Sequence, residues 1–256
     1  DVAELTSRRP YMIVSTSWVL KRLYGRTISK FFYDTFHTLY HHWHSLADVE
    51  ETTNYIPVAE PQSYTTFSHP QVLDGGEVLF LKEDFDQTTA FVTVDPMEGS
   101  QRMIAKIGSL SSRPALSSTG RVWWTEYRQS TLFAQKVNSQ LCYMDLASGR
   151  PRTMHKYRNV LYPTPMDQTG IAWVEYTPDG RYTVVVNGRT ELKRRTEIPM
   201  GSEVHGLAWD DITQALYMII TDDDGMHIAS ITADGIEGVT VPAYTTISDL
   251  QAKGGR

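Results

Sequence analysis

Residues 162–195 read YPTPMDQTGIAWVEYTPDGRYTVVVNGRTELKRR, and this stretch decides the fold because strand-like segments alternate in it with turn signals. Three segments have the extended or apolar character of strands, at residues 162–165, 171–176 and 181–186. Pro178-Asp179-Gly180 reverses the chain, because proline presets the angle that opens a turn and glycine tolerates the positive φ that closes it. Asn187-Gly188 predicts a two-residue hairpin, after which the charged residues 189–195 return as an outermost fourth strand.

The same pattern recurs along the chain. First strands are predicted at His69-Pro70-Gln71-Val72-Leu73, Arg113-Pro114-Ala115-Leu116, Tyr162-Pro163-Thr164-Pro165 and His205-Gly206-Leu207-Ala208-Trp209. Their prolines, with Gly206 in the last, are 44, 49 and 43 residues apart. This period is that of a four-stranded β-propeller blade.

Each predicted first strand is followed by two apolar ones. The second strands are predicted at residues 77–81, 121–125, 171–176 and 215–220, and the third strands at 89–94, 140–145, 181–186 and 226–231. A fifth blade is predicted to start at Ile247-Ser248-Asp249-Leu250. The fold class is therefore mainly β: about four four-stranded propeller blades plus the start of a fifth, forming an incomplete ring.

A helical segment precedes the repeats. Residues 15–24 and 27–50 have helical periodicity, and Gly25 separates them. Large apolar side chains form a stripe on the second helix that we expect to pack against a core: Ile28, Phe32, Phe36, Leu39, Trp43 and Leu46. We therefore predict a helical segment at 1–56 that ends an upstream domain, a linker at 57–68 and the propeller at 69–256.

Composition restricts the function further. The 256 residues carry a net charge of -6, which argues against a nucleic-acid partner because phosphate contacts need a basic face. The one basic run, Lys193-Arg194-Arg195, is predicted to be a solvated edge strand. The single cysteine, Cys142, lies in an apolar strand pattern and is predicted to be buried and inert. No apolar run is long enough to span a membrane. Because the chain begins at Asp1 and its last residues fall inside a repeat, we expect it to be part of a longer protein.

The repeats resemble those of TolB-like β-propellers, whose blades open with a proline, a Ser-Pro-Asp-Gly-like turn and an apolar second strand. The stretch Arg113 to Trp124 carries the best match, and the resemblance covers about residues 69–252. The Pro-Asp of the first turn is missing in every blade. The helical lead-in is also similar to bacterial proteins in which a gluzincin-type peptidase domain precedes such a propeller. The His-Glu-x-x-His motif of that peptidase does not occur in this sequence.

Candidate contact residues share one position in the repeats, beside the proline or glycine of the first strand: His69, Arg113, Tyr162 and His205. Inner strands line a propeller's channel, so these four are the predicted binding residues.

Two groups have some metal-ligand character. The first is a helix face formed by Asp34, His37, His41 and His44, and the second is the acidic turn Asp222-Asp223-Asp224. One helix offers ligands along a single line, and contiguous carboxylates do not match a calcium loop. We therefore predict solvated surfaces at both places and no metal or other cofactor.

No nucleophile or phosphate-binding motif occurs in the sequence. The resulting hypothesis is a non-catalytic propeller that binds a protein or peptide in the periplasm, as part of a larger bacterial envelope protein. The alternative is an accessory propeller of a gluzincin-type peptidase whose catalytic domain is not in this chain. A glycan-processing or lyase propeller is a third possibility.

Overall fold

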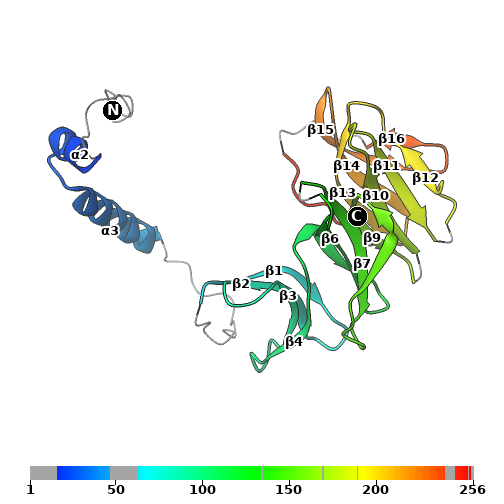
Figure 1. Ribbon diagram of the computed structural model, residues 1–256, viewed down its shortest axis with the longest axis horizontal. Coiled ribbons are helices and arrows are strands. Elements are labelled where there is room, and N and C mark those ends of the chain that lie inside the picture. Colours follow the sequence, from blue (N-terminus) through cyan, green and yellow to red (C-terminus); the bar gives the residue numbers. More distant parts are fainter. Residues whose placement is uncertain are drawn as a thin grey trace. The chain divides into compact units, whose positions relative to one another are not determined.

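The computed structural model describes residues 16–46, 63–133, 135–168, 170–188, 190–239, 246–252 and 254. The chain divides into two compact units, Asp1–Tyr55 and Ile56–Arg256, which are described separately (Figure 1). Among the described residues no helix is long and apolar enough to cross a membrane.

The first unit contains two helices, α2 (Thr16–Tyr24) and α3 (Ile28–Leu46), which confirms the predicted helical lead-in. Gly25 separates them with a φ of 67°, a conformation that glycine adopts at little cost. The hydroxyl of Thr27 accepts a bond from Lys30 N–H (3.4 Å) at the start of α3. The predicted last turn of this helix, residues 47–50, lies outside the described residues.

The apolar stripe of α3 is not packed as expected within this unit. Phe32, Phe36 and Trp43 are 53%, 60% and 59% exposed. Because α2 has only nine residues, it meets α3 near its beginning, where the rings of Tyr24 and Phe31 are 5.8 Å apart. The described part of this unit does not cover the stripe, so its burial against a core stays a prediction.

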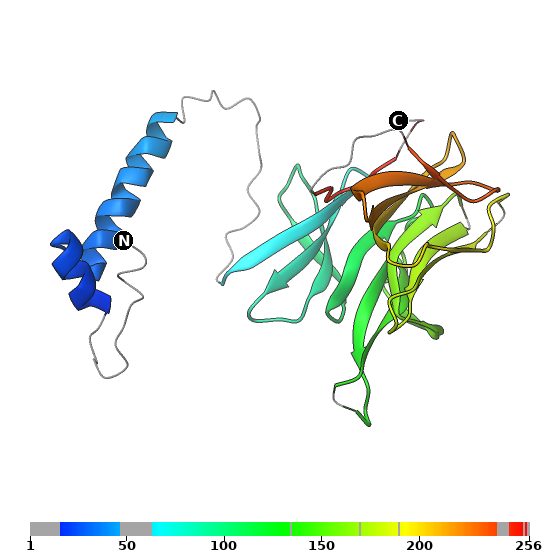
Figure 2. The same cartoon turned by 90° about the horizontal axis from the view of Figure 1, so that it is seen from above.

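The second unit contains four antiparallel four-stranded sheets, which we call blades 1 to 4 (Figures 1 and 2). Blade 1 comprises β1 (Thr65–Val72), β2 (Val78–Asp84), β3 (Ala90–Val94) and β4 (Gln101–Lys106). Blade 2 comprises β5 (Leu110–Leu116), β6 (Arg121–Gln129), β7 (Val137–Asp145) and β8 (Arg152–Arg158). Blade 3 comprises β9 (Val160–Met166), β10 (Gly170–Tyr176), β11 (Tyr182–Asn187) and β12 (Arg195–Glu197). Blade 4 comprises β13 (Glu203–Asp210), β14 (Ala215–Asp222), β15 (Gly225–Ile231) and β16 (Ile236–Gly238).

This architecture confirms the predicted fold class: mostly β, propeller-like, with no sheet closed on itself. Apolar side chains from neighbouring blades form the core. Between blades 1 and 2 the rings of Phe91 and Trp124 meet edge to face, with centroids 5.2 Å apart. Another cluster, around Trp173, packs between blades 2 and 3, and the largest one lies between blades 3 and 4. Successive blades thus bury each other's faces, which is how a propeller without closed sheets acquires a core.

Three features of this unit differ from the sequence prediction. First, β1 begins at Thr65, so the last residues of the predicted 57–68 linker belong to the sheet, while residues 57–62 lie outside the described part. Threonine favours strands because its branched side chain fits a pleated surface.

Second, Asn187-Gly188 does not form a two-residue hairpin. The chain loops out after β11 and pairs again at β12, where Val186 N–H donates to Arg194 O (3.0 Å). Lys193 and Arg194 therefore precede the edge strand instead of forming it. The reason is tertiary: a Cβ on Gly188 would lie 2.8 Å from the Cα of Gly170, so this glycine is needed for close backbone approach.

Third, the predicted fifth first strand at residues 247–250 is not a strand. Ile247 N–H donates to the sulfur of Met226 in β15 (2.9 Å) instead of to a neighbouring strand. The segment 246–252 thus lies against blade 4 without joining its ladder.

Candidate functional site

The inner strands β1, β5, β9 and β13 share one irregularity. In each, the pairing with the second strand of the blade slips by one residue, between Ser68 and Gln71, Ser112 and Ala115, Leu161 and Thr164, and Val204 and Gly206. These β-bulges contain all four predicted contact residues: His69, Arg113, Tyr162 and His205. A bulge leaves a residue unpaired, so it tolerates proline, which has no N–H to donate. The X-Pro signal in the sequence therefore marked the bulges.

Two of the bulge residues have an unusual backbone. His69 and Tyr162 have φ values of 54° and 52°, in the left-handed region that side chains other than glycine seldom adopt. The Tyr162 N–H donates to the hydroxyl of Ser112 in the neighbouring blade (2.9 Å), which helps to hold this conformation.

The structure places Arg113 near enough to His69 for its charge to act on the imidazole. The Arg113 guanidinium forms an ion pair with the carboxylate of Asp249, from the segment 246–252. Partial burial lowers the pKa of His69, and the positive charge of Arg113 lowers it further, while Asp249 and Glu83 act in the opposite direction. His69 is therefore mainly neutral at pH 7, beside a guanidinium that already holds a carboxylate.

Tyr162 and His205 are half-buried in their bulges. Burial raises the pKa of the Tyr162 hydroxyl, and Tyr182, Tyr127 and Glu203 add to the effect. Among the described residues, no hydrogen bond or ion pair links either of them to His69 or Arg113. Blades 1 and 2 therefore supply one cluster, in which Arg113 is the charged group, and the two further bulges supply separate polar positions.

The histidines of α3 are exposed. The Nε2 atoms of His37 and His41 are 3.2 Å apart, His44 packs on Tyr40 with ring centroids 5.0 Å apart, and Asp34 is paired with Arg26 (2.7 Å). Across the described ranges, no three His, Cys, Asp or Glu side chains are grouped so that they could hold a metal ion.

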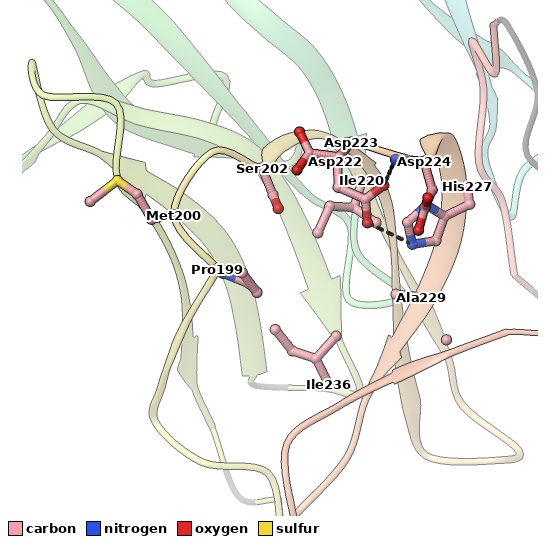
Figure 3. A pocket seen from close by; sticks show the side chains of 11 residues that line it. Pro199, Met200, Ser202, Ile220, Asp222, Asp223, Asp224, His227, Ala229 and Ile236 are labelled. Atoms are coloured by element: carbon pink, nitrogen blue, oxygen red, sulfur yellow. Dashed lines mark hydrogen bonds and ion pairs between the residues drawn. The ribbon is translucent and has the colours of Figure 1, made fainter.

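The acidic turn between β14 and β15 borders a cavity of about 350 Å³ (Figure 3). Its lining comes from blade 4 and from the loop between β12 and β13: Pro199, Met200, Ser202, Ile220, Asp222, Asp223, Asp224, His227, Ala229, Ile236 and Gly238. Asp222 accepts a bond from Asp224 N–H (3.0 Å), and its other oxygen lies 3.7 Å from His227 Nε2. The sequence identified Asp222 and Asp224 but not the cavity, because the residues that complete it lie some twenty positions earlier in the chain.

No protein-family model and no curated protein matched the sequence. Among solved structures, the chain is similar to a puromycin-hydrolyzing peptidase of Mycobacterium tuberculosis, with 16% identity over 74% of this chain and 32% of the other, and a TM-score of 0.56. It is also similar to an oligogalacturonate lyase from Vibrio parahaemolyticus, with 15% identity over 64% of this chain and 50% of the other, and a TM-score of 0.45. A third similar structure is TolB from Acinetobacter baumannii, with 12% identity over 73% of this chain and 57% of the other, and a TM-score of 0.37.

These similar structures are β-propeller folds, and this chain spans between about a third and somewhat over half of their lengths. At such identities the likeness concerns the fold. The propeller fold that the TolB-like repeats implied for the second unit is confirmed by its four four-stranded sheets and by the fold likeness to the peptidase structure.

Proposed function

We propose that this propeller is a non-catalytic module of a larger bacterial envelope protein and that it binds a protein or peptide partner at the bulges of its inner strands. The observation that supports this function best is the ion pair between Arg113 and Asp249. The segment 246–252, which is not a strand, is held at Arg113 by the carboxylate of Asp249, as a bound peptide would be.

The bulge of β5 suits such a role. Arg113 is unpaired in the ladder and partly exposed, so its guanidinium can turn toward a ligand. His69 is neutral beside it and adds a hydrogen-bonding group without competing for the carboxylate. Guanidinium groups bind carboxylates strongly because two parallel N–H bonds match the two oxygens. An extended acidic peptide in place of residues 246–252 would meet the same partners.

The proposal is tested with a labelled peptide, TISDLQA, that copies residues 246–252. In the Asp249→Ala chain, Arg113 loses the carboxylate that it binds within the chain. Fluorescence anisotropy should therefore show that this chain binds TISDLQA at least tenfold more tightly than the TISNLQA peptide. The parent chain should bind it more weakly, and the chain carrying both Asp249→Ala and Arg113→Ala should lose the preference for the acidic peptide. Equal binding of the two peptides to the Asp249→Ala chain would overturn the proposal.

The assignment to the envelope rests on the resemblance of the repeats to those of TolB-like propellers. Its test is the cellular fraction in which the full-length protein is found. Recovery from the cytoplasm alone would refute this part while leaving the peptide site intact.

A second candidate is an accessory propeller of a peptidase. It is favoured by the similarity to the puromycin-hydrolyzing peptidase, which covers 74% of this chain but only 32% of that protein. The discriminating observation is the coding sequence upstream of Asp1. A His-Glu-x-x-His helix there would support a gluzincin-type peptidase, and a domain without it would refute that type.

A further inference from the structure

The cavity on blade 4 combines an apolar floor with an acidic rim (Figure 3). Ile220 and Ala229 are almost fully buried beneath it, Ile236 lies beside them, and Pro199 with Met200 forms a wall. A volume of about 350 Å³ is at the small end of the range for ligand sites, and suits a single long side chain.

The rim is negatively charged. Three carboxylates border the cavity, and none of the described residues that line it is a lysine or arginine. Asp222 is engaged by His227 and by the backbone of its own turn. In the part of the chain that the structure describes, Asp223 and Asp224 have no cation within ion-pair distance, so both carboxylates remain available to a ligand.

Ser202 points to a ligand independently of the charges. It is only 6% exposed, and its hydroxyl has no hydrogen-bond partner among the described residues, although it lines the cavity. Figure 3 shows the Ser202 oxygen directed into the cavity. Because this oxygen faces the cavity and has no partner among the described residues, it can accept a hydrogen bond from a ligand.

We propose that this cavity binds an aliphatic chain ending in an ammonium or guanidinium group, namely a lysine or arginine side chain of a peptide partner. The methylene groups would lie on Ile220, Ile236 and Met200, and the cation between Asp223 and Asp224. The Ser202 oxygen would accept one of its N–H bonds. Long basic side chains bury their stems on apolar surface in this manner. This site shares no residue with the Arg113 site and does not depend on the function proposed there.

The test uses three capped pentapeptides, Gly-Gly-X-Gly-Gly, in which X is lysine, norleucine or glutamate. Binding to the full chain is followed by NMR chemical-shift changes in the ¹⁵N-labelled protein. The lysine peptide should bind in a saturable manner, with shifts centred on residues 199–202 and 222–229, and at least tenfold more tightly than the norleucine peptide. Equal binding of lysine and norleucine, or no saturable binding of lysine, would refute the site.

Matched variants locate the contacts. Asp223→Asn with Asp224→Asn should weaken lysine binding at least tenfold. Asp234→Asn, an exposed aspartate in the next turn that does not line the cavity, should leave it unchanged. Ser202→Ala should weaken binding about 2- to 10-fold without lowering the melting temperature, because the hydroxyl makes no bond in the free chain. Equal loss in the Asp234→Asn variant would show a general charge effect and overturn the proposal.

A free diamine is the other source of the same chemistry. Cadaverine, added alone, should bind more weakly than the lysine peptide if the peptide backbone contributes contacts. Cadaverine binding without any binding of the lysine peptide would overturn the assignment to a peptide side chain.

Discussion

Replacing Glu126 by alanine should destabilise this propeller more than any equivalent change on its surface. Glu126 is 3% exposed at the interface of blades 1 and 2. One of its oxygens accepts bonds from the Trp124 indole N–H (2.8 Å) and from Gly108 N–H (3.1 Å), and the other pairs with Arg128 (2.5 Å). In Glu126→Ala, the buried Trp124 indole N–H loses its acceptor at a cost of about 1–3 kcal/mol, and the partly buried Gly108 N–H loses its acceptor at a smaller cost because water can reach it. We expect a loss of about 3 kcal/mol in the free energy of unfolding.

Blade 3 provides an internal comparison, because it repeats the Trp-x-Glu pattern. The Trp173 indole N–H donates to Glu175 (3.1 Å), and Arg195 pairs with the other oxygen (2.9 Å). Here the glutamate accepts from one indole only, and its side chain is 22% exposed. Water can therefore replace the lost acceptor, so Glu175→Ala should cost only about 1 kcal/mol.

The assay is urea unfolding followed by far-ultraviolet circular dichroism, which is insensitive to the altered surroundings of the tryptophans. Differences in midpoint at unchanged slope report stability. Glu126→Gln is the control: its amide oxygen can still accept both bonds, and it loses only the pair with Arg128, whose half-exposed guanidinium can turn to water, so it should lose clearly less stability than Glu126→Ala. Equal losses for Glu126→Ala and Glu175→Ala, or a Glu126→Gln variant as unstable as Glu126→Ala, would refute the reasoning.

Three further changes test the packing and the titrating groups. Gly188→Ala should lower the free energy of unfolding by about 1–3 kcal/mol, because its Cβ would lie 2.8 Å from the facing backbone of β10, whereas Gly238→Ala, with open space around it, should change little in the same urea assay. A hydrogen bond from Arg121 lowers the pKa of Asp145 in the folded state. The small stabilisation from this pair is therefore present above the ordinary carboxyl pKa of about 3.9 and is lost as the pH falls through the lower pKa that Asp145 has in the folded protein. The Asp145→Asn variant should flatten this part of an acid-unfolding curve. Burial raises the pKa of the Cys142 thiol, so a disulfide reagent at pH 8 should react with it only as fast as the chain unfolds, and rapid labelling of the native chain would contradict its burial.

The sequence predicts the strands of this protein well because their signals are local. The second and third strands are short apolar runs bounded by turn residues, and residues 171–176 and 215–220 lie within β10 and β14. The prediction of a two-residue hairpin at Asn187-Gly188 was wrong because the role of Gly188 is not set by local sequence. That glycine serves a contact with Gly170, which no local pattern encodes.

The candidate sites divide in the same way. The bulges were not predicted, although the sequence carries a signal for three of them, because proline after His69, Arg113 and Tyr162 marks positions that cannot donate to a ladder. The ion pair of Arg113 with Asp249 was not predictable, since 136 residues separate the two and residues 247–250 resemble a first strand. The cavity also escaped prediction, because one of its walls forms only when Pro199 and Met200 fold against blade 4.

The backbone of the bulges bears on whether they serve binding. His69 and Tyr162 adopt a positive φ that glycine would adopt at lower cost, by roughly 1 kcal/mol each. Blade 4 forms its bulge at His205 without a positive φ there, so the fold does not require this conformation in every blade. At these two positions a glycine would stabilise the protein more than the residue present does. Strained backbone positions of this kind concentrate where side chains contact ligands. In blade 1 the retained side chain is the imidazole beside Arg113, which supports the proposal that a carboxylate is bound there.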